Sequence, residues 1–177
     1  MSAAPPDRVR VVVGDIVDQQ VDAIVNAANR ELAAGAGVCG AIFQAAGATE
    51  MTAACRAVAP CPTGEARTTP GFALAAAWVV HAVGPSWSGG GHGEEVLLRS
   101  AYRAALAEAV RVEARSIAFP VLSTGVYGYP LDDGCRAAWE ELSNAPASLD
   151  DVRIVAFGES TAAAFARLGA TVEAGPD

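Results

Sequence analysis

The 177-residue chain contains no lysine, and all 12 of its basic residues are arginine. Mechanisms that need a lysine Schiff base or a lysine nucleophile are therefore excluded. The 20 acidic residues give a net charge of −8 and a pI of about 4.7, which argues against general binding to nucleic acid or to an anionic membrane surface. An anion site built from backbone N–H groups stays possible, because it needs no basic side chain.

Side chains that bind metal ions are also scarce. The cysteines form no CxxC pair and none lies beside a histidine, so we expect neither a metal site nor a disulfide framework. We interpret the cysteines as reduced, mostly buried thiols of a cytoplasmic protein. The residues concerned are Cys39, Cys55, Cys61, Cys135, His81 and His92.

No apolar run is long enough for a membrane helix without an interrupting glycine, proline or charge. The first ten residues lack an apolar segment, so we expect no secretory signal. The hydrophobic content of 52% indicates one compact domain with a core from about residue 8 to 170 and short flexible termini. The richness in arginine and alanine suggests a GC-rich genome, and we expect a bacterial protein.

Apolar runs that read as strands alternate with helical patterns along the chain. This alternation is typical of a three-layer α/β fold, in which ligands lie at the carboxyl ends of strands. We expect strands at 8–13, 23–25, 66–69, 76–83, 116–121 and 153–157, and helices at 40–47, 49–57, 94–112, from 130 onward and at 161–168.

A glycine-rich loop between residues 26 and 40 is the most informative segment. Gly35, Gly37 and Gly40 spell GxGxxG, but the first glycine lies nine residues beyond Asn26 and no acidic strand end follows at the right distance. A dinucleotide-dependent dehydrogenase is therefore disfavoured. The loop fits either an anion cradle of backbone amides or simple close packing of helix and strand.

A second loop, at residues 122–129, is rich in glycine and hydroxyl groups and follows the strand at 116–121. Two such loops fit a ligand with two phosphates, or an elongated one, better than a single phosphate. Three further residues each allow two interpretations. Asp15 can cap a turn, which is the commoner role, or accept from an exocyclic amine; Phe157 can stack on a base or close the core; and for His81 a hydrogen-bonded core histidine is favoured over catalysis.

Seven motifs occur together and in order. They are GDI at 14–16, VNAAN at 25–29, GxGV at 35–38, GAI at 40–42, CPTGEA at 61–66, HAVGP at 81–85 and STGVYGYP at 123–130. With them the chain resembles the macrodomains, ADP-ribose-binding α/β/α modules with a central mixed sheet. The resemblance is closest to the MacroD-type hydrolases and spans roughly residues 9 to 158.

The resemblance implies a role for each matching residue. Asp15 would accept from the adenine amine beside the Ile16 backbone, and Phe157 would stack near the base. Asn29 would hold the distal ribose and act in catalysis, with Asn26 supporting the loop. The diphosphate would be held from two sides by Gly35, Ala36, Gly37 and Val38 and by Ser123, Thr124, Gly125, Val126 and Tyr127.

Two positions depart from the hydrolase pattern. Cys39 stands where the water-activating aspartate of the family belongs, and Phe43 stands where the family usually has histidine. The resemblance implies a hydrolase that removes mono-ADP-ribose from acidic side chains, needs no metal or cofactor, and has ADP-ribose and ADP-ribosylated proteins as partners. A reader without turnover and a deacetylase of O-acetyl-ADP-ribose are the alternatives, and we expect a monomer.

Overall fold

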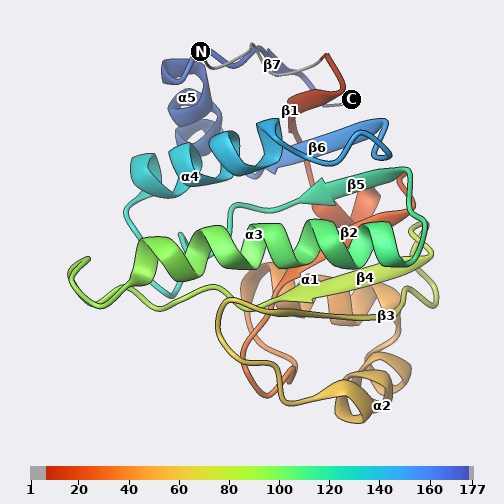
Figure 1. Cartoon of the computed structure of the whole chain (residues 1–177). Helices are drawn as coiled ribbons and strands as arrows, with labels where there is room; N and C mark the ends of the chain where they lie inside the picture. Colours follow the sequence, from red (N-terminus) through yellow and green to blue (C-terminus); the bar gives the residue numbers. More distant parts are fainter. Residues whose placement is uncertain (1–6, 176–177) are drawn as a thin grey trace.

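The computed structural model describes residues 7–175, in which helices cover both faces of a central sheet (Figure 1). Of the ends expected to be flexible, residues 1–6 and 176–177 lie outside this range, whereas the segment after residue 170 contains a short strand at Val172–Glu173. No helix within the described range is both long and apolar enough to cross a membrane.

The sheet has seven strands in the order β3-β4-β2-β5-β6-β1-β7. Only β3, which pairs with β4, runs antiparallel; every other pairing is parallel. The predicted α/β/α fold with a mixed sheet is therefore confirmed. The strands are β1 (Val9–Val13), β2 (Ala23–Ala27), β3 (Ala66–Pro70), β4 (Trp78–Ala82), β5 (Ser116–Phe119), β6 (Asp151–Ala156) and β7 (Val172–Glu173).

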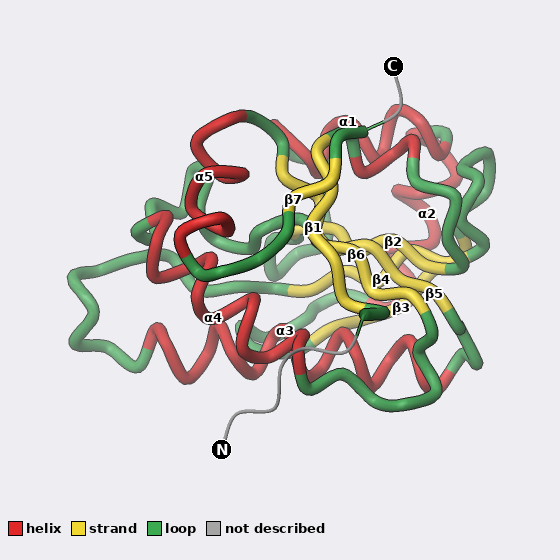
Figure 2. The backbone as a smooth tube through the Cα atoms, turned by 90° about the horizontal axis from the view of Figure 1, so that it is seen from above, coloured by secondary structure: helices red, strands yellow, loops and turns green. Residues whose placement is uncertain are grey.

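Two helical layers enclose the sheet, as the view along it shows (Figure 2). On one side α3 and α4 pack together and α4 contacts α5; on the other side α1 packs on β2 and α2 packs on β3. The helices are η1 (Ile16–Asp18), a short 3-10 turn, α1 (Gly37–Ala46), α2 (Ala48–Val58), α3 (Glu94–Arg111), α4 (Leu131–Ser143) and α5 (Glu159–Arg167).

Side chains of β2, an interior strand of the sheet, alternate between the two layers, as the period of two in a strand requires. Ala23 and Val25 of β2 belong to the core under α3, α4 and α5. Ile24 belongs to the core under α1 and α2. Because both faces are covered, the strand reads as a continuous apolar run rather than an alternating one.

Several boundaries differ from those expected. The strand expected at 116–121 ends at Phe119, and the one expected at 153–157 begins at Asp151. The helix expected at 40–47 begins at Gly37, so Val38 and Cys39 lie in its first turn. The strand expected at 76–83 is confined to Trp78–Ala82. β7 was not predicted, because a two-residue strand at a sheet edge has no periodicity to detect.

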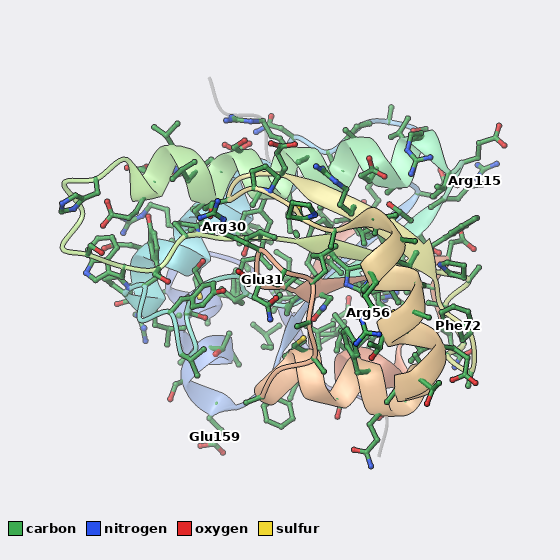
Figure 3. The ribbon with its side chains drawn as sticks, turned by 90° about the horizontal axis from the view of Figure 1, so that it is seen from below. Arg30, Glu31, Arg56, Phe72, Arg115 and Glu159 are labelled. Carbon is green, nitrogen blue, oxygen red and sulfur yellow. The ribbon has the colours of Figure 1, made fainter. Side chains whose placement is uncertain are left out.

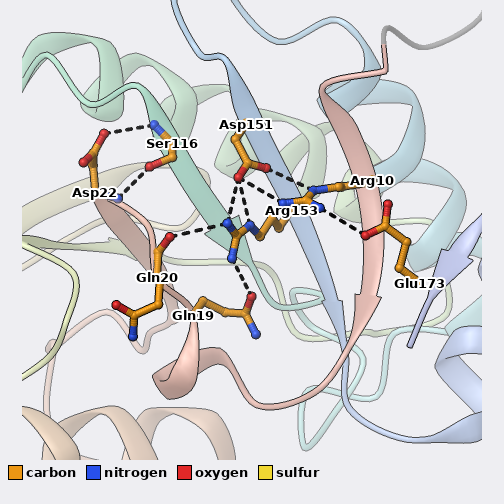
Figure 4. A network of polar contacts seen from close by, with 8 residues as sticks. All are labelled: Arg10, Gln19, Gln20, Asp22, Ser116, Asp151, Arg153 and Glu173. Atoms are coloured by element: carbon orange, nitrogen blue, oxygen red, sulfur yellow. Dashed lines mark hydrogen bonds and ion pairs between the residues drawn. The ribbon is translucent and has the colours of Figure 1, made fainter. Parts of the chain in front are cut away.

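A polar network holds the β6, β1 and β7 side of the sheet together (Figure 4). The Asp151 carboxylate accepts from Arg153 at 2.8 and 3.0 Å and from Arg10 at 3.2 and 3.3 Å. Arg10 also pairs with Glu173 of β7 at 3.1 Å. Burial alone would raise the pKa of Asp151, but the hydrogen bonds from Arg153 and Arg10 outweigh it and lower the pKa. The network thus ties the last strand to the first.

Candidate functional site

The residues singled out from the sequence collect at the carboxyl edge of the parallel strands. Asp15 follows β1, Phe157 follows β6, Ser123 follows β5 and Asn29 follows β2, and these strands lie in the order β2-β5-β6-β1. With β4 included, the edge covers four inter-strand spacings, about 19 Å. Residues far apart in sequence therefore line one elongated site.

A cavity of about 310 Å³ opens at the β4, β2 and β5 part of this edge. None of its lining residues is charged, so its polarity comes from main-chain groups and a few neutral side chains. It is lined by Ala27, Ala28, Asn29, Gly35, Ala36, Gly37, Val38, Cys39, Gly84, Pro120, Val121, Leu122, Ser123, Gly125, Val126 and Tyr127. The two predicted loops therefore form opposite walls of one cavity.

The first wall runs from Asn29 into the first turn of α1. The Asn29 amide forms two hydrogen bonds with the backbone of Ala33, each 2.9 Å long, one donated and one accepted. This clamp fixes the loop that leads to Gly35. The first N–H groups of a helix have no partner within the helix, and α1 presents its first turn to the cavity through Gly37, Val38 and Cys39.

A close backbone contact shapes this wall. A Cβ atom placed on Gly40 would lie 2.5 Å from the Gly35 carbonyl oxygen. Such a distance is well inside van der Waals contact, so the loop can fold against α1 only because Gly40 has no side chain.

The second wall is the segment after β5. Ser123 has a positive φ of 67°, a left-handed conformation that costs a non-glycine residue about 1–3 kcal/mol and is often found at functional sites. Its hydroxyl is buried and has no hydrogen-bond partner among the described residues. Thr124 is not among the residues that line the cavity, and its hydroxyl donates to the Val121 carbonyl at 3.1 Å.

Tyr127 belongs to the second wall. Burial raises the pKa of its phenol, and the negative charge of Glu31 adds to the effect, so the hydroxyl is neutral at neutral pH. Glu31 and its neighbour Arg30 lie on the exposed segment between β2 and α1 (Figure 3).

Asp15, Ile16 and Phe157 lie at the β1 and β6 part of the edge, outside the cavity. The Asp15 carboxylate caps η1 by accepting from the Val17 N–H at 3.1 Å, so the turn-cap interpretation is confirmed. Phe157 is 78% exposed, so the alternative that it closes the core is wrong. Its ring is free to contact a ligand.

Asn26 does not face the cavity. It is buried in β2, and its amide nitrogen contacts His81 Nδ1 at 3.1 Å and donates to Cys39 Sγ at 3.6 Å. On its other side His81 Nε2 contacts the Thr69 hydroxyl at 2.9 Å. The core-histidine interpretation is thus confirmed. Burial lowers the pKa of His81 to about 4, so the ring is neutral at neutral pH. The buried contacts of His81 extend through Asn26 to Cys39.

All four cysteines are free and buried, as expected. Within residues 7–175 no three metal-ligating side chains come together. Burial raises the pKa of Cys55 to about 11 and that of Cys135 to about 12. Of the four, only Cys39 lines the cavity.

Comparison with known proteins agrees with this geometry. The family model described as Macro domain matches residues 25–138. A macro domain-containing protein of Mesorhizobium japonicum is 44% identical, with 96% of this chain and 97% of that protein covered. A Salmonella gallinarum protein named O-acetyl-ADP-ribose deacetylase is 45% identical, with 91% and 93% covered.

Solved structures of macrodomains are similar to this chain as well. The Oceanobacillus iheyensis macrodomain with ADP has a TM-score of 0.86 and 36% identity, covering 94% of this chain and 93% of that one. The Trypanosoma brucei macrodomain in complex with ADP-ribose has a TM-score of 0.84 and 36% identity, covering 92% and 69%. The three-layer fold with a ligand site at its carboxyl edge defines an α/β binding module or enzyme. The chain belongs to the macro domain family.

Proposed function

We propose that this protein binds ADP-ribose and hydrolyses ADP-ribosyl esters, removing mono-ADP-ribose from acidic side chains of proteins. The observation that carries the proposal is the uncharged cavity between two walls rich in main-chain amides. Such amides stabilise a diphosphate at short range, so a protein of net charge −8 can still bind an anion. The diphosphate would lie between residues 35–38 and 123–127, with the distal ribose beside Asn29.

The reaction asks little of a side-chain base at Cys39. A carboxylate is already a good leaving group, so the cavity chiefly has to hold the distal ribose and a water molecule in the right orientation. Asn29 and the ligand's own phosphate are the groups that would position that water. ADP-ribosylated proteins are the partners that follow from this proposal, and we propose that the protein acts as a monomer in the cytoplasm.

A second candidate substrate is an acetylated ADP-ribose. It is favoured by the name of the Salmonella gallinarum relative, O-acetyl-ADP-ribose deacetylase. A third candidate, binding without turnover, is favoured by Cys39, which takes the place of the carboxylate expected in a hydrolase.

Release of ADP-ribose from a glutamate-linked, auto-modified protein separates these candidates. We expect turnover by the wild type and turnover within about threefold of it in Cys39→Ala, because the reaction asks little of a side-chain base at this position. A gain of turnover in Cys39→Asp would show that a carboxylate here adds general-base catalysis. Cys135→Ala, which removes a buried thiol that does not line the cavity, is the matched control.

Each alternative has its own outcome when ADP-ribose binding and turnover of acetylated ADP-ribose are measured beside this assay. No turnover by the wild type together with tight ADP-ribose binding would make the protein a reader. Turnover of acetylated ADP-ribose alone would make it a deacetylase. Loss of turnover in Cys39→Ala would show that the thiol takes part after all.

The adenine assignment is tested by replacing Asp15 with asparagine. The substitution keeps an oxygen to cap η1 but removes the carboxylate, so we expect ADP-ribose to bind about tenfold more weakly, the loss of one charge-assisted hydrogen bond. The melting temperature should stay within a few degrees. Asp18→Asn, at an exposed carboxylate of the same turn, is the control, and calorimetry with equal affinities for Asp15→Asn and wild type would refute the assignment.

A further inference from the structure

Glu94, the first residue of α3, lies outside the cavity and has an unusual environment. Its side chain is only 2% exposed and folds back over the loop that precedes the helix. One carboxylate oxygen accepts from the N–H groups of Ser88 at 3.0 Å and Gly90 at 2.8 Å, and the other accepts from His92 at 2.6 Å. Three main-chain donors therefore converge on one buried carboxylate.

These contacts keep the carboxylate ionised. The hydrogen bond from Ser88 has the largest effect, and together with those from Gly90 and His92 it outweighs burial and lowers the pKa of Glu94 to about 2. Hydrogen bonds to a charged acceptor are about twice as strong as those between neutral groups. The loop of residues 86–93, which is rich in glycine and has little intrinsic order, is thereby fixed in one conformation.

The fixed loop in turn contacts the second wall of the cavity. The Trp87 N–H donates to the Tyr127 carbonyl at 2.7 Å. The Trp87 ring meets Tyr129 edge to face, with 4.8 Å between ring centroids. On its other side the indole lies against Gly90, where an added Cβ would be 2.8 Å from the ring. Glu94, Gly90, Trp87 and Tyr127 thus form an unbroken line of contacts to the cavity.

Few other hydrogen bonds among the described residues hold positions 125–129 of the second wall. Within it the Tyr129 N–H donates to the Ser123 carbonyl at 2.9 Å and the Gly128 N–H donates to the Gly125 carbonyl at 3.0 Å. Val126, at its tip, is 93% exposed. Figure 1 shows that the loop before α3 lies at the same end of the sheet as the segment after β5, so it can act as a support for that segment.

We propose that Glu94 is a positioning residue for the ligand: it fixes the loop of residues 86–93, and this loop fixes the main chain of residues 125–129 that forms one wall of the cavity. Glu94 does not touch the ligand in this proposal. The effect on ADP-ribose binding rests on the proposed function. The effect of Glu94 on the main chain of residues 86–93 and 125–129 is independent of it.

Hydrogen exchange and calorimetry on Glu94→Gln test the proposal. Glutamine is isosteric but carries no charge and one acceptor oxygen fewer, so we expect the amides of Trp87, Gly128 and Tyr129 to exchange at least about tenfold faster in the unliganded variant. We expect the ADP-ribose Kd to rise about tenfold, within the range of coupling through a packed network. Glu95→Gln, at the neighbouring exposed carboxylate, should change both quantities by less than about twofold.

A purely local role for Glu94 would give a different result. Faster exchange confined to residues 88–92, with residues 125–129 and the Kd unchanged, would overturn the proposal. If the wild type does not bind ADP-ribose, the proposed function is refuted, and exchange at residues 125–129 in the unliganded variant still decides the role of Glu94.

The wild type provides a second test in case Glu94→Gln does not fold. Coupling between two sites is reciprocal, so saturating ADP-ribose should slow exchange at Ser88, Gly90 and His92 by at least about threefold, although none of them lines the cavity. Binding without any slowing at these amides would overturn the proposal.

Discussion

Replacing Gly40 with alanine is expected to weaken ADP-ribose binding by about 100-fold or more. The new methyl group would lie 2.5 Å from the Gly35 carbonyl oxygen, a backbone atom that cannot rotate away. The loop must therefore move, and the amides of residues 35–38 move with it. Losing two charge-assisted hydrogen bonds of about 1.5 kcal/mol each accounts for a change of this size.

The free energy of unfolding of Gly40→Ala should fall by less than the free energy of ADP-ribose binding. Forcing a methyl group into a packed site costs about 1–3 kcal/mol, and we expect the protein to stay folded at room temperature. The control is Ala45→Gly, the opposite exchange at an exposed position of the same helix. It should cost about 1 kcal/mol of stability and leave the affinity for ADP-ribose unchanged. An affinity of Gly40→Ala equal to that of the wild type would show that this close contact does not shape the binding loop.

Acidification from pH 6.5 to 5 is expected to remove about 2 kcal/mol of stability through His81. The unfolded histidine titrates near pH 6.5, whereas burial lowers the pKa in the folded protein to about 4. Between these values the unfolded chain binds a proton that the folded one does not, so stability falls as the pH falls. Over about 1.5 pH units, at 1.36 kcal/mol for each unit, the loss is about 2 kcal/mol.

Urea unfolding followed by tryptophan fluorescence at pH 7, 6 and 5 measures this loss. His81→Gln should be less stable at pH 7, because its contacts with Asn26 and Thr69 change, but it should show a flatter pH dependence in this range. His92→Gln, at an exposed position, should retain the wild-type slope. Equal slopes for His81→Gln and the wild type would contradict a neutral buried imidazole.

The sequence predicted the features that depend on local pattern. Buried strands such as β2 and β5 are short apolar runs, and the loops that follow them are marked by glycine, so both the layered fold and the two cavity walls could be derived. The burial of His81 also follows from its place in an apolar strand. These are properties of consecutive residues, and they need no knowledge of the tertiary structure.

Other features depend on contacts between distant residues. The start of α1 at Gly37 has no capping side chain and so leaves no local signal. The clamp that Asn29 makes on Ala33, and the three amides gathered by Glu94, depend on the path of each loop. A glutamate in the first turn of a helix is common, so nothing in its position distinguishes Glu94 from Glu95. For such residues the partner, not the residue type, determines the role.

The place of β1 in the sheet has a consequence for how the protein is made. This strand, which is made before the rest of the sheet, pairs with β6 and β7, more than 130 residues later. Such distant pairings form slowly, because a long loop must close before any contact forms. Asp15 and Phe157 lie at the ends of β1 and β6, so the adenine end of the proposed site does not exist in the nascent chain. A growing polypeptide can assemble the β4, β2 and β5 part of the cavity first, but it becomes able to hold a whole ligand only when β1 and β6 have paired.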